Sequence, residues 1–112
     1  MKKLFMLPII LLILSGFTGV LKTSLTLTVR DEVGNVVEGA SVKLFVNKED
    51  YEKELKPIAT ATTDAKGVAK FKEINNLNIF ILVRKGDQDN SGGGEQTKLE
   101  KGKINKVTVV IQ

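Results

Sequence analysis

The sequence contains no cysteine and no histidine, and these two absences exclude several classes of chemistry. Without cysteine the chain can form no disulfide, no thiolate metal site and no catalytic thiol. Without histidine it lacks the commonest general base and the commonest ligand of transition metals. Tryptophan is also absent and aromatic residues make up only 5% of the chain, so stacking platforms for bases or sugars are hard to build. We therefore expect a protein that is not an enzyme and needs no cofactor.

The charge of the chain gives no sign of a nucleic-acid partner. The formal net charge is +4, from 17 Lys+Arg against 13 Asp+Glu. Lys2 and Lys3 supply half of that excess and precede an apolar run, and the other lysines are scattered among acidic residues. A scattered distribution is typical of a solvated surface rather than of a nucleic-acid footprint.

The first 19 residues have the three parts of a secretory signal peptide. Two lysines are followed by an apolar run from Leu4 to Leu14 and then by small residues. We expect residues 1–19 to form a helix that is a signal peptide or an uncleaved membrane anchor. Residues 20–23 would then be a linker. Beyond the leader we expect no contact with a membrane.

Two fates of the leader stay open. Cleavage near the small residues Gly16, Thr18 or Gly19 would release the protein to the periplasm, the cell surface or the medium. Retention of residues 4–21 would anchor it, because about 18 apolar residues are only just long enough to span a bilayer. Cleavage is favoured, since Pro8 and the glycines make a poor permanent helix.

From residue 24 onward, short segments alternate between apolar and polar residues, which is the pattern of half-buried β-strands. We expect strands over residues 24–30, 40–47, 58–63, 68–72, 78–84, 97–100 and 106–111. Their regular spacing without a helical crossover predicts an all-β domain over residues 24–112, an antiparallel Greek-key β-sandwich of about seven strands. The side chains with inward parity form the predicted core: Leu25, Leu27, Val29, Val42, Leu44, Phe71, Ile79, Ile81, Val83, Val107 and Val109.

Two turns and one insertion connect these strands. The first turn lies at residues 31–36, with Gly34 and Asn35 at its tip, and the second is Asp64–Gly67, a type I turn with glycine in the left-handed position. The charged insertion 47–57 breaks the β pattern. It favours one or two turns of helix, capped by Asn47 and stopped at the proline, or else a solvated connection.

A family pattern is visible in three stretches: Asp31 with GNVVEGASVKL at 34–44, TTDAKGVAKF at 62–71, and IFILV at 79–83. Together they resemble the carboxypeptidase regulatory-like domains of the transthyretin-like (prealbumin-like) sandwich group. The sequence departs from that pattern at Val36, where proline is usual, and at Ile79, where tyrosine is usual. The resemblance implies a non-catalytic module of an exported or surface protein of a bacterial envelope.

Related domains with catalytic or covalent chemistry use residues that this chain lacks. Transthyretin-like hydroxyisourate hydrolases need histidines, and intradiol dioxygenases bind iron through histidine and tyrosine, whereas Tyr51 is the only tyrosine here. Modules with a Lys–Asn isopeptide bond need an asparagine in the last strand. The predicted last strand, 106–111, contains none.

One loop contains part of a calcium-binding pattern. Asp87, Asp89 and Ser91, followed by a glycine, reproduce the opening spacing of a calcium loop, and Glu95 stands at its ninth position. The twelfth position, which should supply a bidentate carboxylate, is Lys98. We therefore predict no metal site, with these four residues as candidates for a weak calcium loop at 87–95. An ordinary Gly-, Asp- and Asn-rich loop has the same composition.

Three apolar residues have the parity of the outer face: Phe45, Phe80 and Leu82. The insertion could cover them with Tyr51 and Leu55, they could be scattered exposed residues, or they could contact a partner. We predict a non-catalytic exported module that binds or supports an envelope protein or a surface polymer. The alternative is a module that binds a small ligand or a carbohydrate.

Overall fold

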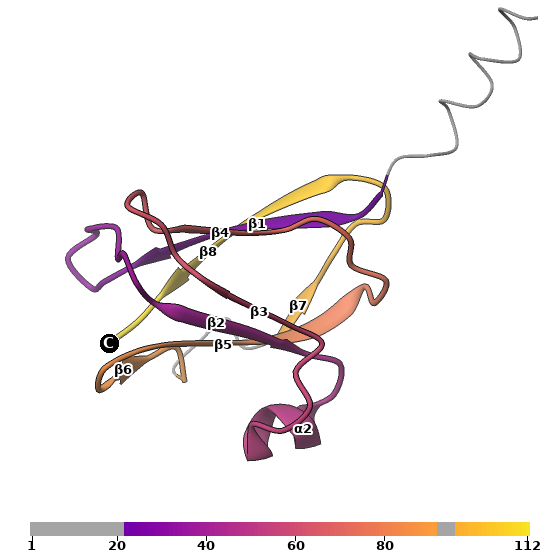
Figure 1. The fold of residues 1–112 in the computed structure, drawn as a ribbon, viewed down its shortest axis with the longest axis horizontal. Helices are drawn as coiled ribbons and strands as arrows, with labels where there is room; N and C mark the ends of the chain where they lie inside the picture. Colours follow the sequence, from indigo (N-terminus) through magenta and orange to yellow (C-terminus); the bar gives the residue numbers. More distant parts are fainter. Residues whose placement is uncertain (1–21, 92–95) are drawn as a thin grey trace, which may run out of the picture.

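A computed structural model describes residues 22–91 and 96–112 of the chain, and it confirms an all-β sandwich of two packed sheets with one short helix outside them (Figure 1). The predicted leader with its helix, the first half of the predicted linker and Glu95 lie outside the described residues. No helix among the described residues is long and apolar enough to cross a membrane. The elements are β1 (Ser24–Arg30), β2 (Ser41–Phe45), α2 (Lys48–Lys53), β3 (Ala59–Thr62), β4 (Val68–Phe71), β5 (Asn78–Lys85), β6 (Gln88–Asp89), β7 (Gln96–Lys98) and β8 (Ile104–Val110).

The smaller sheet has three strands in the order β4-β1-β8. β4 runs antiparallel to β1, with Leu25 opposite Phe71. β8 runs parallel to β1 over the whole length of both strands, from Ser24 opposite Ile104 to Arg30 opposite Val110. The prediction of a purely antiparallel sandwich is therefore wrong at this pair, since the two strands are far apart in sequence and the chain returns to the same end before it enters β8.

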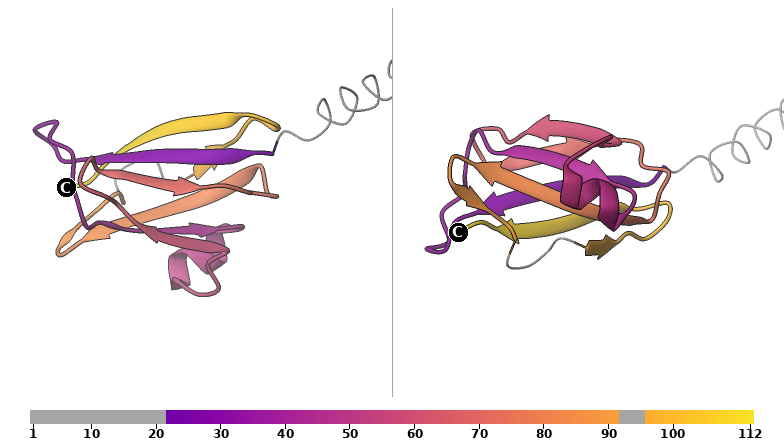
Figure 2. Two further views of the ribbon diagram at one scale, coloured as in Figure 1. Left: turned by 45° about the horizontal axis from the view of Figure 1, so that its top comes forward. Right: turned by 90° about the horizontal axis from the view of Figure 1, so that it is seen from below.

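The larger sheet has five strands. Four of them follow the order β3-β2-β5-β6, and β7 pairs with the first residues of β5, whereas β6 pairs with its last residues. β2 and β5 form its centre, and Val42 lies opposite Val83 while Phe45 lies opposite Phe80. β6 is a two-residue strand that the sequence pattern does not indicate, because it lies in a polar loop. The two sheets face each other and α2 lies on the outer side of the larger one (Figures 1 and 2).

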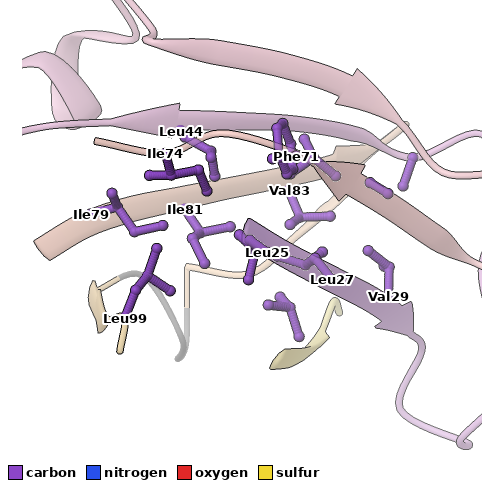
Figure 3. Close-up of a cluster of buried hydrophobic side chains, with 14 of the residues drawn as sticks. Leu25, Leu27, Val29, Leu44, Phe71, Ile74, Ile79, Ile81, Val83 and Leu99 are labelled. Atoms are coloured by element: carbon purple, nitrogen blue, oxygen red, sulfur yellow. The ribbon is translucent and has the colours of Figure 1, made fainter. Parts of the chain in front are cut away.

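The core lies between the sheets and contains the predicted inward side chains (Figure 3). Ten of the eleven predicted core residues are buried and Val107 is partly buried against them. The alternation of each strand fixes which side chains point inward, so the local pattern was sufficient for this result. The core also holds side chains outside the predicted set: Ala40, Ala69, Ile74, Leu99 and Ile111.

The two predicted turns form as expected and are closed by aspartate side chains. Asp64 Oδ1 accepts hydrogen bonds from the backbone amides of Lys66 and Val68, and Gly67 has a φ of 75°. A side chain at Gly67 would be strained and would also lie 2.8 Å from the Val36 side chain. The hydrogen bonds to Asp64 hold its pKa below the usual range.

Different connections between strands form the two ends of the sandwich. β1 and β8 both begin at one end, which we call the leader end: Lys22–Thr23, the insertion 46–58, the connection 72–77 and the turn 99–103. We call the opposite end, where the C-terminus lies in Figure 1, the distal end: the loop 31–39 and the turns 63–67 and 85–87.

Candidate functional site

The candidate site is the outer face of the larger sheet beside α2. Cross-strand pairing sets its rows: Phe45 lies opposite Phe80, Lys43 opposite Leu82, and Ser41 opposite Arg84. The face is therefore aromatic near the leader end and cationic near the distal end. It contains the three outward apolar residues that the sequence singled out.

The insertion forms a short helix, as the sequence favours. The Asn47 side chain accepts a hydrogen bond from the Asp50 backbone amide at 2.8 Å, which confirms the predicted N-cap. At its other end, Glu54 adopts the left-handed conformation with a φ of 55°, and Lys56 does the same just before Pro57. These two left-handed residues lie in the connection from α2 to β3, and α2 itself contacts β2 and β5 on the outer side of the larger sheet (Figure 2).

Tyr51 covers the aromatic part of the face. Its ring lies 6.0 Å from that of Phe45 in an edge-to-face arrangement and 5.8 Å from that of Phe80. Phe45 is fully buried, although its parity points outward, and Leu82 is only 7% exposed. As they stand, Phe45 and Leu82 present almost no surface to a partner, and Phe80 is half-buried.

Leu55 does not share in this cover. One of the three alternatives left open by the sequence was cover by Tyr51 and Leu55 together, but Leu55 is 54% exposed. The left-handed turn at Glu54 directs the chain away from the sheet before Leu55. Of the two residues, Tyr51 covers the aromatic part of the face and Leu55 is largely exposed.

An ion pair fastens the end of α2 to β5. The Arg84 guanidinium donates two hydrogen bonds to the Glu54 carboxylate, at 2.8 and 2.9 Å. The bond from Arg84 lowers the pKa of Glu54, and the same bond raises the pKa of Arg84. A bidentate pair has defined geometry as well as charge attraction, so it fixes where α2 ends on the sheet.

A hollow of about 320 Å³ lies beside this pair. Its floor is Leu82, and its other lining residues are Ser41, Lys43, Arg84 and Gly86. An apolar floor flanked by an ammonium, a guanidinium and a hydroxyl suits a small acidic group such as a carboxylate.

The calcium candidates do not converge in the described part of the chain. Asp89 belongs to β6, and its carboxylate accepts a hydrogen bond from the Ser91 amide at 3.0 Å, which holds the pKa of Asp89 below its usual range. Asp87 is exposed in the preceding turn. Residues 22–91 and 96–112 contain no group of three or more acidic side chains able to hold a metal ion. Calcium binding by the loop stays a prediction.

Asn90, which the sequence analysis overlooked, is one of the most buried polar residues in the described chain. It is 1% exposed; its Oδ1 accepts from the Val83 amide and its Nδ2 donates to the Ile81 carbonyl, each at 2.9 Å. Asn90 thus takes the place of a strand partner beside β5. Its signal in the sequence was weak, since an asparagine in a polar loop is normally exposed.

Asn105 corrects another expectation. The last strand was predicted to start at residue 106 and to hold no asparagine, but β8 starts at Ile104 and contains Asn105. The amide of Asn105 donates to the Ser24 and Glu100 carbonyls at 3.1 Å and accepts from the Glu100 amide at 2.8 Å. These bonds close the turn before β8, so the side chain has a structural role at the leader end.

Comparisons with known proteins give this chain no family and no relative. A scan against protein families found no match, and a search of curated proteins found none either. The function must therefore be argued from the residues and contacts described above.

Proposed function

We propose that the chain is a non-catalytic exported β-sandwich module that binds or supports another component of the cell envelope. Residues 1–19 serve as its leader, and residues 24–112 supply the binding module. We propose further that the module belongs with the carboxypeptidase regulatory-like domains and has their Greek-key topology. The aspartate- and glycine-based turns at 31–36 and 63–67, each of which leads into a sheet strand, support this resemblance.

The observation that carries the binding proposal is the hollow over Leu82. Lys43 and Arg84 bring two positive charges to its lining; Glu54 forms an ion pair with Arg84, and the charge of Lys43 acts on Glu54 only from a longer distance. Lys43 has no carboxylate partner among the described residues. An acidic group of an envelope protein or a surface polymer would pair with Lys43 while an apolar part covers Leu82.

The residue types that the sequence lacks support the proposal that the module is not an enzyme. The sequence has neither histidine nor cysteine, so its hydroxyl groups have no conventional base partner. Two of the most buried polar side chains, Thr63 and Asn90, form hydrogen bonds with backbone groups of the domain itself. They stabilise loops and strands and leave no free polar atom for chemistry.

Fractionation and partner capture test this function. The full gene should give a protein recovered with the envelope or the medium, and mass spectrometry of its amino terminus will show whether the leader is removed. A photo-crosslinker placed through Ser41→Cys, in the lining of the hollow, should capture a defined envelope component, because the chain has no other cysteine.

A matched probe at Lys70→Cys, on the outer face of β4 in the other sheet, is the control. Capture at position 41 and not at 70, abolished when Lys43→Glu is added to the Ser41→Cys protein, would support the proposal. Recovery of the full-length chain in the cytoplasm would overturn export. Equal capture at both positions would show that the hollow is not the binding surface.

A further inference from the structure

The last strand, β8, is a long strand at the edge of the smaller sheet (Figure 2). It pairs with β1 on one side and with no strand of the described residues on the other. β8 has seven residues, whereas the other edge strands are short: β3 and β4 have four each, β6 has two and β7 has three. Shortness protects an edge from pairing with another chain, and so do bulges. β8 has neither protection, because its register with β1 is continuous.

Hydrogen bonds at the two ends of β8 show which of its backbone groups face the open side. The Ser24 amide donates to the Lys103 carbonyl, and the Ile111 amide donates to the Arg30 carbonyl. Successive residues of a strand direct their backbone groups to opposite edges. The odd-numbered residues of β8 therefore bond with β1, and the even-numbered residues direct their N–H and C=O groups away from it.

The open part of this edge ends at Val110. Beyond it, the backbone of Gln112 exchanges two hydrogen bonds with that of Asp89 in β6, so the edge is covered there. Four exposed residues direct backbone groups to the open part: Ile104, Lys106, Thr108 and Val110. Within residues 22–91 and 96–112, these groups have no hydrogen-bond partner. An open row of this kind is a template for a further strand.

The side chains along the open edge suit a second copy of the same strand. Ile104 is 68% exposed at the first position of β8, and Val110 is 49% exposed at its last position. A two-fold axis brings the same surface of two copies together, with their strands antiparallel. The first residue of one β8 then lies near the last residue of the other. Lys106, the only charged residue of β8, lies between these two apolar positions.

Charge and existing hydrogen bonds restrict the register of such a pair. With the axis at Lys106, the two lysines would lie directly opposite each other, which is destabilising. With the axis at Thr108, Ile104 would lie opposite Gln112, whose outward backbone groups are already bonded to Asp89. The register between these two has its axis at Val107 and meets neither obstacle.

We infer that the protein forms a homodimer in which the β8 strands of two copies pair antiparallel about an axis at Val107. Ile104 lies opposite Val110 of the second copy, and this apolar pair occurs at both ends of the ladder. Lys106 lies opposite Thr108 of the second copy. Each of these pairs exchanges two backbone hydrogen bonds, and the two smaller sheets become one continuous sheet.

The absence of cysteine allows the register to be tested with disulfides in the full chain. Genes with Ile104→Cys and with Val110→Cys, carrying different tags, are co-expressed, and the cells are treated with copper phenanthroline. We expect the mixed disulfide to exceed either self-disulfide several-fold, because the two copies of one position lie about 20 Å apart along the ladder. Ile104→Cys co-expressed with Lys70→Cys, on the outer face of β4, is the control for random collision.

Charge exchange at Lys106 tests the same pairing through a second readout. The two Lys106 side chains are diagonal neighbours in this register, about 7–8 Å apart, and they repel each other. Lys106→Glu in one of the two co-expressed chains should increase the mixed disulfide several-fold. Lys106→Glu in both chains should return it to the original level, since the charges are alike again. Lys70→Glu in one chain should have no effect.

A mixed disulfide no more abundant than in the control would overturn the dimer. A self-disulfide at Ile104 or at Val110 that exceeds the mixed one would overturn the register. Equal effects of Lys106→Glu in one chain and in both would also contradict it. The inference is independent of the hollow over Leu82, so Lys43→Glu should abolish capture of the envelope component and leave the mixed disulfide unchanged.

Discussion

At the scale of single residues, Asn90 is the side chain whose loss has the clearest expected consequence. Asn90→Ala leaves the Val83 amide and the Ile81 carbonyl buried without partners. Each unpaired buried group costs about 1–3 kcal/mol, so we expect the free energy of unfolding to fall by about 2–4 kcal/mol. Urea denaturation measures this change in the free energy of unfolding. Asn76→Ala, at an exposed position, is the control, and a loss equal to the control would contradict the role of Asn90.

The Glu54–Arg84 pair predicts an acid dependence of stability. The pKa of Glu54 is below its usual 4.5 in the folded protein because Arg84 donates hydrogen bonds to it. The unfolded chain therefore binds this proton more readily. The stabilisation is complete above pH 4.5 and is lost as the pH falls through the lowered pKa of the folded state.

Thermal melting between pH 7 and pH 3 tests the pair. Glu54→Gln should lower the melting temperature at pH 7 by a small amount, since the pair is solvent-exposed, and should reduce the further loss in acid. Glu52→Gln, two residues earlier in the same insertion, should keep the wild-type profile. If both variants follow the wild-type curve, the pair does not contribute to stability.

At the scale of elements, α2 depends on Tyr51 and not on Leu55. Tyr51→Ala removes the ring that contacts Phe45 and Phe80 and exposes both. Aromatic pairs contribute about 0.5–1.5 kcal/mol beyond area burial, so we expect a loss of about 1–2 kcal/mol in chemical denaturation. Leu55→Ala should change stability by less than about 0.5 kcal/mol, as exposed positions do. A larger effect at Leu55 than at Tyr51 would mean that the helix docks differently.

From the structure of the loop after β5, we expect the stability of the protein not to depend on calcium. Asp89 is already hydrogen-bonded in its own turn, and the position that should supply a bidentate ligand is Lys98. Millimolar calcium should leave the melting temperature unchanged. A rise of several degrees that disappears in an Asp87→Ala, Asp89→Ala variant would reverse this view, because a ligand that binds only the native state must stabilise it.

The sequence was informative about elements whose structure is set locally. β1 has the predicted bounds, and the turn at Asp64–Gly67 has the predicted conformation, because alternation and glycine act over a few residues. The burial of Phe45 could not be predicted with the same certainty. It depends on where the helix that follows β2 places Tyr51, which is a tertiary contact.

The remaining misses also depend on long-range contacts. Asn90 is buried because β6 pairs with β5 while the Asp89 backbone exchanges two hydrogen bonds with Gln112. Ile74 and Leu99 enter the core from connections, where strand periodicity gives no indication. For the candidate site, the sequence named Phe80 and Leu82 but not Lys43 or Arg84, since these residues come together only when β2 pairs with β5.

At the scale of the whole molecule, a single core joins both sheets, and Ile81 lies fully buried within it. Ile81→Ala should cost about 2–5 kcal/mol, the usual range for a large-to-small change in a core. Circular dichroism and Tyr51 fluorescence should report the same transition midpoint. Ile104→Ala, at an exposed position, should cost less than about 0.5 kcal/mol. A cost that small at Ile81 would mean that the inward register of β5 is wrong.

The parallel pairing of β1 with β8 has a mechanical consequence. The two strands lie side by side from Ser24 and Ile104 at the leader end to Arg30 and Val110 at the distal end. A chain held before Lys22 and pulled through Gln112 would load this pair along the strand direction. Its ladder of hydrogen bonds would then be sheared together instead of being opened one at a time. A module tethered at one end and attached to its partner at the other would carry tension along the axis on which its strand pairing resists separation most.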